Sequence, residues 1–396
     1  MSQASQSAID RVVAVAAAHA DAVDREGRFP TEAIAALREE GLLGAMIPEP
    51  LGGDGATMGT LVGYCQRLAG ACASTAMIFA MHQIQVACIV MHGLDQDWYE
   101  ALARRIASDQ LLLASITSEV GIGGDMRSSL CAVEIDEDRF TLTKHATTVS
   151  YGGYADLFLL TARADREAPA SSQVLVTISR GDCTMTATSG WDSLGMRGTC
   201  STGFECVAAG VPDQVFATPF ADIAAETMLP VSHLLWGGVW TGIAVAAVTR
   251  ARKFLRAQAR RQPNAPTLGS TRLMQAVGLL ESIQSRLAVL IASYDASHAL
   301  GSDRDVMSEA DARWPVGIAR ATVLNMLKYD ASEMCHQAVL HAMLICGMAG
   351  YKNDTEFSVG RHLRDILSAQ LMINNDRVAA NTGALLFAQR SELGRL

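Results

Sequence analysis

The sequence predicts a multidomain α+β protein with a helical N-terminal domain, a central antiparallel β sandwich or barrel, and a C-terminal four-helix bundle. Apolar residues recur at helical spacing before about residue 112 and again after Pro219. Between these regions lie short strand-like runs separated by turn residues, with no intervening helix, which favours an antiparallel sheet. We therefore expect domains at 1–112, 113–218 and 219–396.

Composition excludes some classes of function. The chain has 396 residues, of which 49% are hydrophobic and 18% are charged, so it can bury a large core. Its formal net charge of −9 argues against a general nucleic-acid binder.

The cysteines predict a reducing compartment and no metal centre. Nine of them are scattered along the chain without a CxxC pair or a Cys/His cluster at zinc spacing. Residues 1–5 lack the basic and apolar regions of a signal peptide. We therefore expect a cytoplasmic protein that binds no metal.

The first 112 residues are predicted to form helices. A helix signal begins at Pro30 and ends at Gly41, with an apolar stripe between them. Prolines and paired glycines break the helical pattern over 42–53. Two further helices are predicted around Met58–Cys72 and Ser74–Met91, and the second is almost uncharged and therefore buried.

The central region reads as strands, because its residues have β propensity and its runs are bounded by Gly, Asp, Ser and Pro. The predicted strands are Phe140–Thr143, Leu157–Thr161, Gln173–Ile178 and Cys183–Thr186.

Long helices return in the last third. Residues 234–249 carry no charge but are fewer than the roughly 20 needed to span a bilayer, so we expect a buried helix and no membrane span. A basic pattern continues this helix to Arg261. Further apolar stripes at helical spacing cover 273–291 and 314–344, and a final helix follows Asn375.

A glycine-rich segment, 116–125, follows the apolar run 111–115. It contains Gly121, Gly123 and Gly124 after a Thr-Ser-Glu triplet. Glycine tolerates positive φ and lets backbone N–H groups approach a ligand. Successive N–H groups in such a turn form a concavity suited to a phosphate. By itself this segment is also consistent with an ordinary surface turn.

Four motifs in order resemble those of the acyl-CoA dehydrogenase superfamily of flavoproteins. They are Ile47–Gly55 (IPEPLGGDG), Ser118–Asp125 (SEVGIGGD), Leu194–Thr199 (LGMRGT), and Gly347–Glu356 (GMAGYKNDTE) running on to Arg364-Asp365. The resemblance covers nearly the whole chain. It implies that family's fold and an FAD cofactor, or FMN if the chain is a monooxygenase.

The resemblance also implies which residues contact the flavin. In the glycine-rich loop these are Ile116, Thr117, Ser118, Gly123 and Gly124, with the Ser118 hydroxyl at the ring edge and the glycines facing the pyrophosphate. Gly124 stands where the family usually has serine, so one side-chain contact is lost.

A second flavin contact of the family is a W-x-T tripeptide, which falls on Thr148, Val149 and Ser150. Ser150 keeps a hydroxyl that could reach the flavin, whereas Thr148 replaces the aromatic residue. A plain β strand is the other reading of these residues.

In this family a neighbouring subunit binds the adenine end of FAD, so the resemblance implies a homo-oligomer, either a dimer or a tetramer. The matching positions here are Arg261, Gln275, Gly347 and Gly350. A guanidinium suits phosphate binding, although a surface arginine is the alternative reading. The usual RxFG reads Arg-Gln-Pro-Asn at 261–264, and Leu344 and Met348 replace the usual Gln and second Gly.

The catalytic base of the family is missing. An acyl-CoA dehydrogenase needs a buried, aimed carboxylate that removes the α proton of a thioester. The usual Glu falls on Ile373, and the family's other location falls near Ser232-His233. His233 or Asp376 could supply a base from a shifted position, although each also fits a structural role.

Three functions follow from this pattern. The first is α,β-dehydrogenation of an acyl thioester on CoA or a carrier protein, with electron-transfer flavoprotein as the acceptor. The second is a monooxygenase of the same fold, supplied by a flavin reductase and acting on a small aromatic or heteroatom-containing substrate. That branch also lacks the Glu, and Arg364-Asp365 with Asn375-Asp376 matches its RD…ND spacing, although its His falls on Met372. The third is a flavin-binding protein without turnover.

Overall fold

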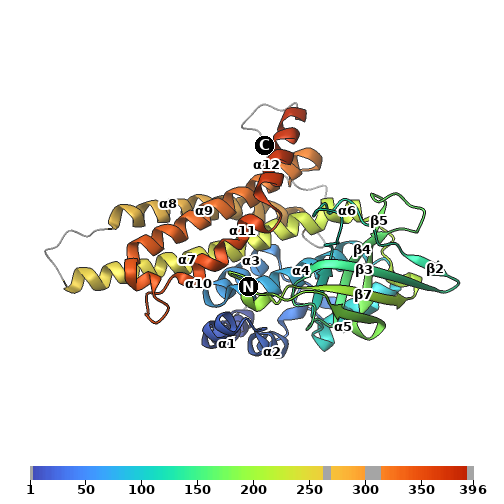
Figure 1. The fold of residues 1–396 in the computed structure, drawn as a ribbon, viewed down its shortest axis with the longest axis horizontal. Coiled ribbons are helices and arrows are strands. Elements are labelled where there is room, and N and C mark those ends of the chain that lie inside the picture. Colours follow the sequence, from blue (N-terminus) through green and yellow to red (C-terminus); the bar gives the residue numbers. More distant parts are fainter. Residues whose placement is uncertain (1–2, 262–268, 299–313, 390–396) are drawn as a thin grey trace. The chain divides into compact units, whose positions relative to one another are not determined.

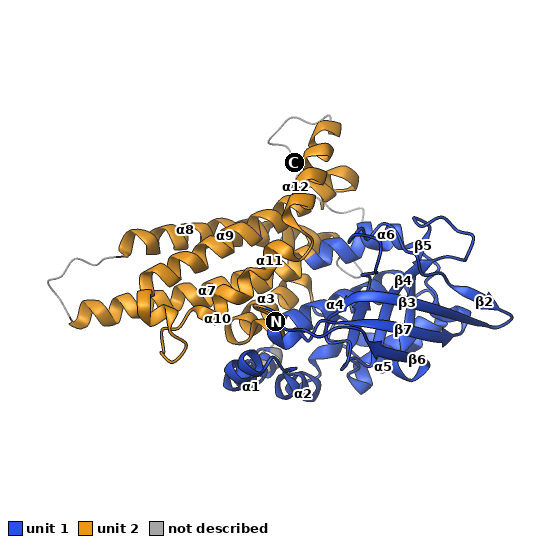
Figure 2. Ribbon diagram, in the orientation of Figure 1, with its two compact units in different colours: residues 1–56, 77–193, 197–232 blue, residues 57–76, 194–196, 233–396 orange. Residues whose placement is uncertain are grey.

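The computed structural model describes residues 3–261, 269–298 and 314–389. These residues form two compact units, shown in separate colours in Figure 2. Unit 1 comprises residues 1–56, 77–193 and 197–232, and unit 2 comprises residues 57–76, 194–196 and 233–396.

Unit 1 begins with helices. They are α1 (Gln3–Glu26), α2 (Thr31–Glu39), α5 (Asp97–Asp109) and most of α4 (Ala73–His92), followed much later by the short α6 (Phe220–Ile223). Helix α2 begins after Pro30 and is followed by Gly41 at φ 74°, which is the start and stop signal seen in the sequence.

The proline-glycine break between α2 and α4 forms two short 3-10 turns, η1 (Leu42–Gly44) and η2 (Glu49–Leu51). A Cβ at Gly53 would overlap the carbonyl oxygens of Ile47 and Gly44. The second glycine of this motif is therefore required by close backbone packing.

The strands of unit 1 form two sheets. The first has the order β1 (Leu113–Ile116), β4 (Leu157–Arg163), β5 (Gln173–Ser179). The second has the order β2 (Glu134–Asp136), β3 (Arg139–Val149), β7 (Thr202–Gly210), β6 (Cys183–Ala187). All four predicted strands are present, and β1, β2 and β7 are additional.

Burial along the strands explains why the sequence pattern predicted some strands and missed others. Strand β3 alternates buried and exposed residues, whereas β4 is almost wholly buried. Strand β2 is exposed at every residue, so it carries no apolar signal. Sheet pairing is antiparallel except for β1, which pairs with β4 in parallel, with Leu113 opposite Leu157.

Unit 2 is built from helices. They are α3 (Met58–Ala71), α7 (Leu229–Arg261, from His233 onward), α8 (Ser270–Ser297), α9 (Gly317–Tyr351), α10 (Gly360–Ile366), α11 (Ser368–Leu371) and α12 (Asn375–Ala388). Helices α8 and α9 lie side by side in Figure 1, and α9 also contacts α10 and α12. Helix α9 is kinked at Gly347, which has φ 54°.

Three helical stretches within the described residues are long and apolar enough to cross a membrane, judged by length and composition alone. The most apolar windows of α4 and of Phe220–Arg261 are 83% and 89% buried inside the structure. Burial in the fold therefore accounts for the uncharged run at 234–249, as predicted. Only 33% of the corresponding window of α8 is buried.

Candidate functional site

The glycine-rich segment forms an exposed turn directly after β1. Gly121, Gly123 and Gly124 have φ values of 95°, 58° and 75°. Residues with a Cβ rarely adopt this conformation, so the turn geometry itself accounts for the three glycines. A Cβ at Gly123 would meet no heavy atom within 4 Å. Glycine is therefore needed at this position for the backbone conformation and not for packing.

The turn is joined to the second predicted flavin segment. The Ser118 Oγ donates to the Thr148 carbonyl oxygen at 2.7 Å and accepts from the Thr148 N–H at 3.2 Å. These bonds bring the loop and the tripeptide together. They also engage the Ser118 hydroxyl, whose contact with a flavin stays a prediction.

The neighbouring residues of both segments differ in burial. Ile116 and Val149 are fully buried, whereas Thr117 is half-buried. The Ser150 Oγ lies 2.8 Å from the Ser201 Oγ. Main-chain contacts to a ligand are therefore the ones open to Ile116 and Val149, while Thr117 could also use its side chain.

Glu119 fixes the base of this loop, a role that the sequence did not reveal. Its carboxylate accepts hydrogen bonds from Ser129 Oγ at 2.7 Å and from the N–H groups of Leu130 and Cys131 at 3.1 and 2.7 Å. The Lys144 Nζ lies 3.0 Å away, and the two side chains are 4% and 0% exposed. Burial alone would raise the pKa of the Glu119 carboxyl, but the Lys144 charge and the Ser129 hydroxyl lower it below its usual value.

These features are compatible with a bound flavin. A turn with three glycines at positive φ lets its main chain approach a pyrophosphate closely. The buried Glu119–Lys144 pair holds the start of that turn in place. The residues that would hold the flavin here are thus Ser118, the loop glycines and the main chain at 148–150.

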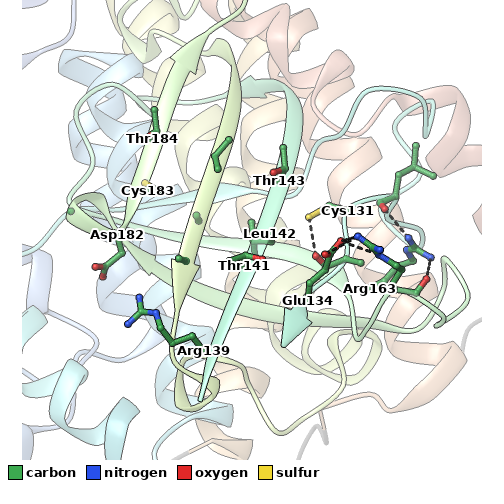
Figure 3. Close-up of a pocket in the computed structure, with 17 residues that line it drawn as sticks. Cys131, Glu134, Arg139, Thr141, Leu142, Thr143, Arg163, Asp182, Cys183 and Thr184 are labelled. Carbon is green, nitrogen blue, oxygen red and sulfur yellow. Dashed lines mark hydrogen bonds and ion pairs between the residues drawn. The ribbon is translucent and has the colours of Figure 1, made fainter. Parts of the chain in front are cut away.

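A separate pocket of about 670 Å³ lies on unit 1, and none of the predicted flavin residues lines it. Figure 3 shows that it is bordered by Arg139 and Thr141 on β3 and by Cys183 on β6. Arg163, at its rim, donates to the carbonyl oxygens of residues 130, 166 and 168, so its guanidinium serves the local loop. The part of the chain that is described contains no group of three or more His, Cys, Asp or Glu that could hold a metal ion.

The residues expected at the adenine end lie in unit 2. Arg261 ends α7 and Gln275 lies in the second turn of α8, and both are exposed. Residues 262–264 of the predicted motif lie outside the described residues. Gly347 is exposed at the kink, and a Cβ at Gly350 would overlap the Cβ of Cys346.

The two candidate bases lie in contrasting environments. His233 is 2% exposed, and neither ring nitrogen has a hydrogen-bond partner among the described residues. Burial, with a smaller contribution from the Lys328 charge, lowers the pKa of His233 to about 3. Asp376 is exposed in the first turn of α12, where its N–H donates to Asn374 Oδ1 at 2.9 Å. Their catalytic roles stay predictions.

Ile373 lies in the short connection before α12, with φ 52°. Its carbonyl oxygen accepts a 2.6 Å hydrogen bond from the Nζ of Lys328 on α9, whose side chain is buried. The sequence did not single out Lys328. A lysine on an otherwise apolar helix face was the available signal.

Arg364 and Asp365, at the end of the fourth motif, form hydrogen bonds with the main chain of the third motif (Leu194–Thr199) within unit 2. The Asp365 Oδ1 accepts from the Met196 N–H at 2.7 Å, and the Arg364 Nη1 donates to the Leu194 carbonyl at 3.2 Å. Two motifs that are far apart in sequence are therefore parts of one contact.

Comparison with known families agrees with this arrangement. "Acyl-CoA dehydrogenase, N-terminal domain" matches residues 2–108, and "Acyl-CoA dehydrogenase, C-terminal domain" matches residues 224–382. Together they cover about two thirds of the chain.

Individual relatives have differing activities. The amino sugar nitrososynthase DnmZ of Streptomyces peucetius is 26% identical over 362 residues, covering 88% of this chain and 84% of DnmZ. The probable acyl-CoA dehydrogenase FadE25 of Mycobacterium tuberculosis is 23% identical over 364 residues, covering 91% of this chain and 88% of FadE25.

A solved relative shares the fold over almost the whole length. FMN-bound TdsC from Paenibacillus sp. A11-2 has a TM-score of 0.81 and 18% identity, covering 97% of this chain and 98% of TdsC. The predicted fold and the flavin expectation are thus confirmed, and the chain belongs to the acyl-CoA dehydrogenase family of flavoproteins.

Proposed function

We propose that the protein is a reduced-flavin-dependent monooxygenase that oxidises a small aromatic or heteroatom-containing substrate. One observation carries this proposal. The family's usual position for the catalytic carboxylate falls on Ile373, an apolar residue whose backbone is held by Lys328. The alternative position falls on Ser232-His233, and His233 has a pKa of about 3. Neither position supplies a carboxylate to abstract a thioester α proton.

The chain's own residues would bind and orient the reactants. The loop glycines would approach the flavin pyrophosphate, and the main chain at 148–150 would contact the ring. Bound reduced flavin supplies two electrons to dioxygen, so that one oxygen atom is added to the substrate and the other leaves as water. Ile373, at the position of the family's base, would offer no group for acid–base chemistry.

The relatives support this choice and suggest the class of substrate. DnmZ is named as a nitrososynthase that acts on an amino sugar, and TdsC is named as a dibenzothiophene monooxygenase. One name concerns a nitrogen compound and the other a sulfur compound. A nitrogen or sulfur atom is therefore our first expectation for the position that is oxidised.

The test is oxygen transfer. The protein is supplied with flavin, a flavin reductase and NAD(P)H under isotopically labelled dioxygen, with a panel of aromatic amines, thioethers and amino sugars. We expect one labelled oxygen atom in a product that does not form without the protein. Reduced-flavin oxidation that yields only hydrogen peroxide with every substrate would contradict the proposal and favour the non-catalytic alternative.

Dehydrogenation of an acyl thioester is the second candidate, favoured by the end-to-end similarity to FadE25. It requires a base, and His233 and Asp376 are the candidates that the sequence provides. Anaerobic bleaching of bound flavin by an acyl-CoA, lost in His233→Ala or Asp376→Asn, would support it. Electron-transfer flavoprotein would then be the partner, in place of the flavin reductase that the monooxygenase needs.

We also propose that the protein is a homo-oligomer formed through unit 2. Helix α9 exposes apolar side chains on both sides of its kink at Gly347, and α8 exposes others. The exposed residues are Leu340, Leu344, Met348 and Tyr351 on α9, and Met274, Val277 and Val289 on α8. Exposed apolar surface of this kind is typical of a subunit interface.

Paired charges on this surface are expected to dissociate the oligomer. The double substitution Leu344→Glu and Met348→Glu would force two carboxylates into an apolar contact, so the particle mass measured by light scattering should fall to that of one chain. Ala17→Glu, at an exposed position on α1, is the control and should leave the mass unchanged. An unchanged mass in the double variant would place the interface elsewhere.

The cellular location remains a prediction. All nine cysteines are free thiols in the structure, in keeping with a reducing compartment. We therefore expect the protein in the cytoplasm, where flavin reductases supply reduced flavin.

A further inference from the structure

Ile373 has an unfavourable backbone conformation for its type. Its φ of 52° lies in the left-handed region, where a β-branched side chain is a steric outlier. Five other non-glycine residues of the described chain have positive φ, and none of them is β-branched: Gln110, Glu137, Tyr151, Met196 and Cys200. Such strain persists only where the surroundings hold the residue in place.

Lys328 is the residue that holds it. The Nζ donates to the Ile373 carbonyl oxygen at 2.6 Å and to Asn375 Oδ1, also at 2.6 Å. Hydrogen bonds from a charged donor are stronger than neutral ones. One ammonium group therefore binds both the Ile373 main-chain carbonyl and the Asn375 side chain, which lie on either side of residue 374.

A second set of hydrogen bonds holds Asn375 itself. Its Nδ2 donates to the Ser332 Oγ at 2.9 Å and to the Glu333 Oε1 at 2.8 Å. The Gln370 Nε2 donates to the same Glu333 oxygen at 3.0 Å. The connection that contains Ile373 is thus attached to α9 at several points.

The charge of Lys328 is costly to bury. Its side chain is fully buried, and no ion pair joins it to a carboxylate within the described ranges. The Trp240 ring centroid lies 5.8 Å from the Nζ, which offers partial compensation. A well-packed apolar residue is often no less stable than a buried charge, so the ammonium is better explained by what it positions.

We infer that Lys328 is a positioning residue, which holds the Ile373 peptide in the left-handed conformation and thereby fixes the direction of the Ile373 side chain. This inference rests on the proposed function, in which Ile373 occupies the place of the family's base. Lys328, on α9, would then affect how the substrate binds, a role that none of the four sequence motifs indicated.

A double-mutant cycle tests the backbone part of the inference without any turnover. Glycine accepts positive φ without strain, so Ile373→Gly keeps the main-chain acceptor for Lys328 and removes the strain that this hydrogen bond opposes. Lys328→Met in the natural background loses the hydrogen bond but lets the Ile373 peptide leave its strained conformation, whereas in Ile373→Gly there is no strain to release. We therefore expect Lys328→Met to raise the unfolding equilibrium constant, measured in urea, about tenfold more in Ile373→Gly than in the natural background. Lys253→Met, at an exposed position on α7, is the control. Equal effects in both backgrounds would overturn the inference.

Substrate kinetics test the positioning part. With the flavin-loaded protein, Lys328→Met should raise the substrate KM about tenfold while the flavin Kd stays within about twofold of its natural value. Lys328→Gln, which keeps a donor, should recover part of the loss, and it replaces Lys328→Met in both tests if that variant does not fold. A lower kcat with unchanged KM would overturn the inference, because it would indicate only a smaller folded fraction.

The two tests separate the inference from the proposed function. If the natural protein transfers no oxygen but bleaches with an acyl-CoA, the same KM comparison is made with that thioester. If it turns over neither substrate, the proposed function fails and the double-mutant cycle alone decides whether Lys328 holds Ile373.

Discussion

Glu119→Gln is expected to lower the unfolding free energy by about 3–5 kcal/mol, because it leaves the Lys144 ammonium buried without its partner. Lys144 is fully buried, and its remaining hydrogen bonds go to Ser129 Oγ and to the carbonyl and hydroxyl oxygens of Thr161. None of these acceptors is charged. Urea unfolding followed by circular dichroism measures the change.

An exposed ion pair on the same unit provides the matched control. Arg166 contacts Glu134 at 2.7 Å, but the side chains are 70% and 47% exposed. Glu134→Gln should therefore change the unfolding free energy by no more than about 1 kcal/mol. Equal losses in Glu119→Gln and Glu134→Gln would contradict the structural role of the buried pair.

The pH dependence of stability should reveal the same Glu119–Lys144 pair. The folded pKa of Glu119 lies below its usual value of 4.5, so the unfolded state binds the proton more readily. The stability that this carboxylate provides is present above pH 4.5 and is lost as the pH falls through the folded pKa. The unfolding free energy should therefore fall less steeply with acid in Glu119→Gln than in the natural protein.

Gly195→Ala is expected to lower the unfolding free energy by about 1–3 kcal/mol or more, because the added Cβ would overlap the Arg364 carbonyl. The backbone beside it cannot shift freely, since the Met196 N–H is bonded to Asp365. The new methyl group thus separates the third motif from the Arg-Asp pair. Urea unfolding measures this loss as well.

Gly63→Ala is the control in the same unit. A Cβ at this position, inside α3, would meet no heavy atom within 4 Å. Alanine is favoured over glycine in a helix, so we expect a gain of about 0.5–1 kcal/mol. If both glycine substitutions behave alike, the contact between the two motifs is not a constraint on the fold.

The order of helices and strands and the glycine-rich turn could be predicted because their signals are local. Helical spacing, strand-like runs and clustered glycines are each visible in a window of a few residues. The positive φ values at Gly121, Gly123 and Gly124 follow from the same local signal.

Other parts could not be predicted because they depend on partners distant in sequence. Lys328 bonds to a residue 45 positions away, and Lys144 bonds to one 25 positions away. The parallel pairing of β1 with β4 likewise joins Leu113 to Leu157, and a short buried strand carries no alternation. Hydrogen-bond partners of this kind leave no periodic pattern.

The most direct test of the central claim is an anaerobic titration of the flavin-loaded protein with acyl-CoAs of short, medium and long chain. The visible absorbance of oxidised flavin is followed after each addition. Because no carboxylate stands at the position of the family's base, we predict that the absorbance stays unchanged with every thioester. Rapid bleaching by any of them would contradict the monooxygenase and make the protein a dehydrogenase with a displaced base.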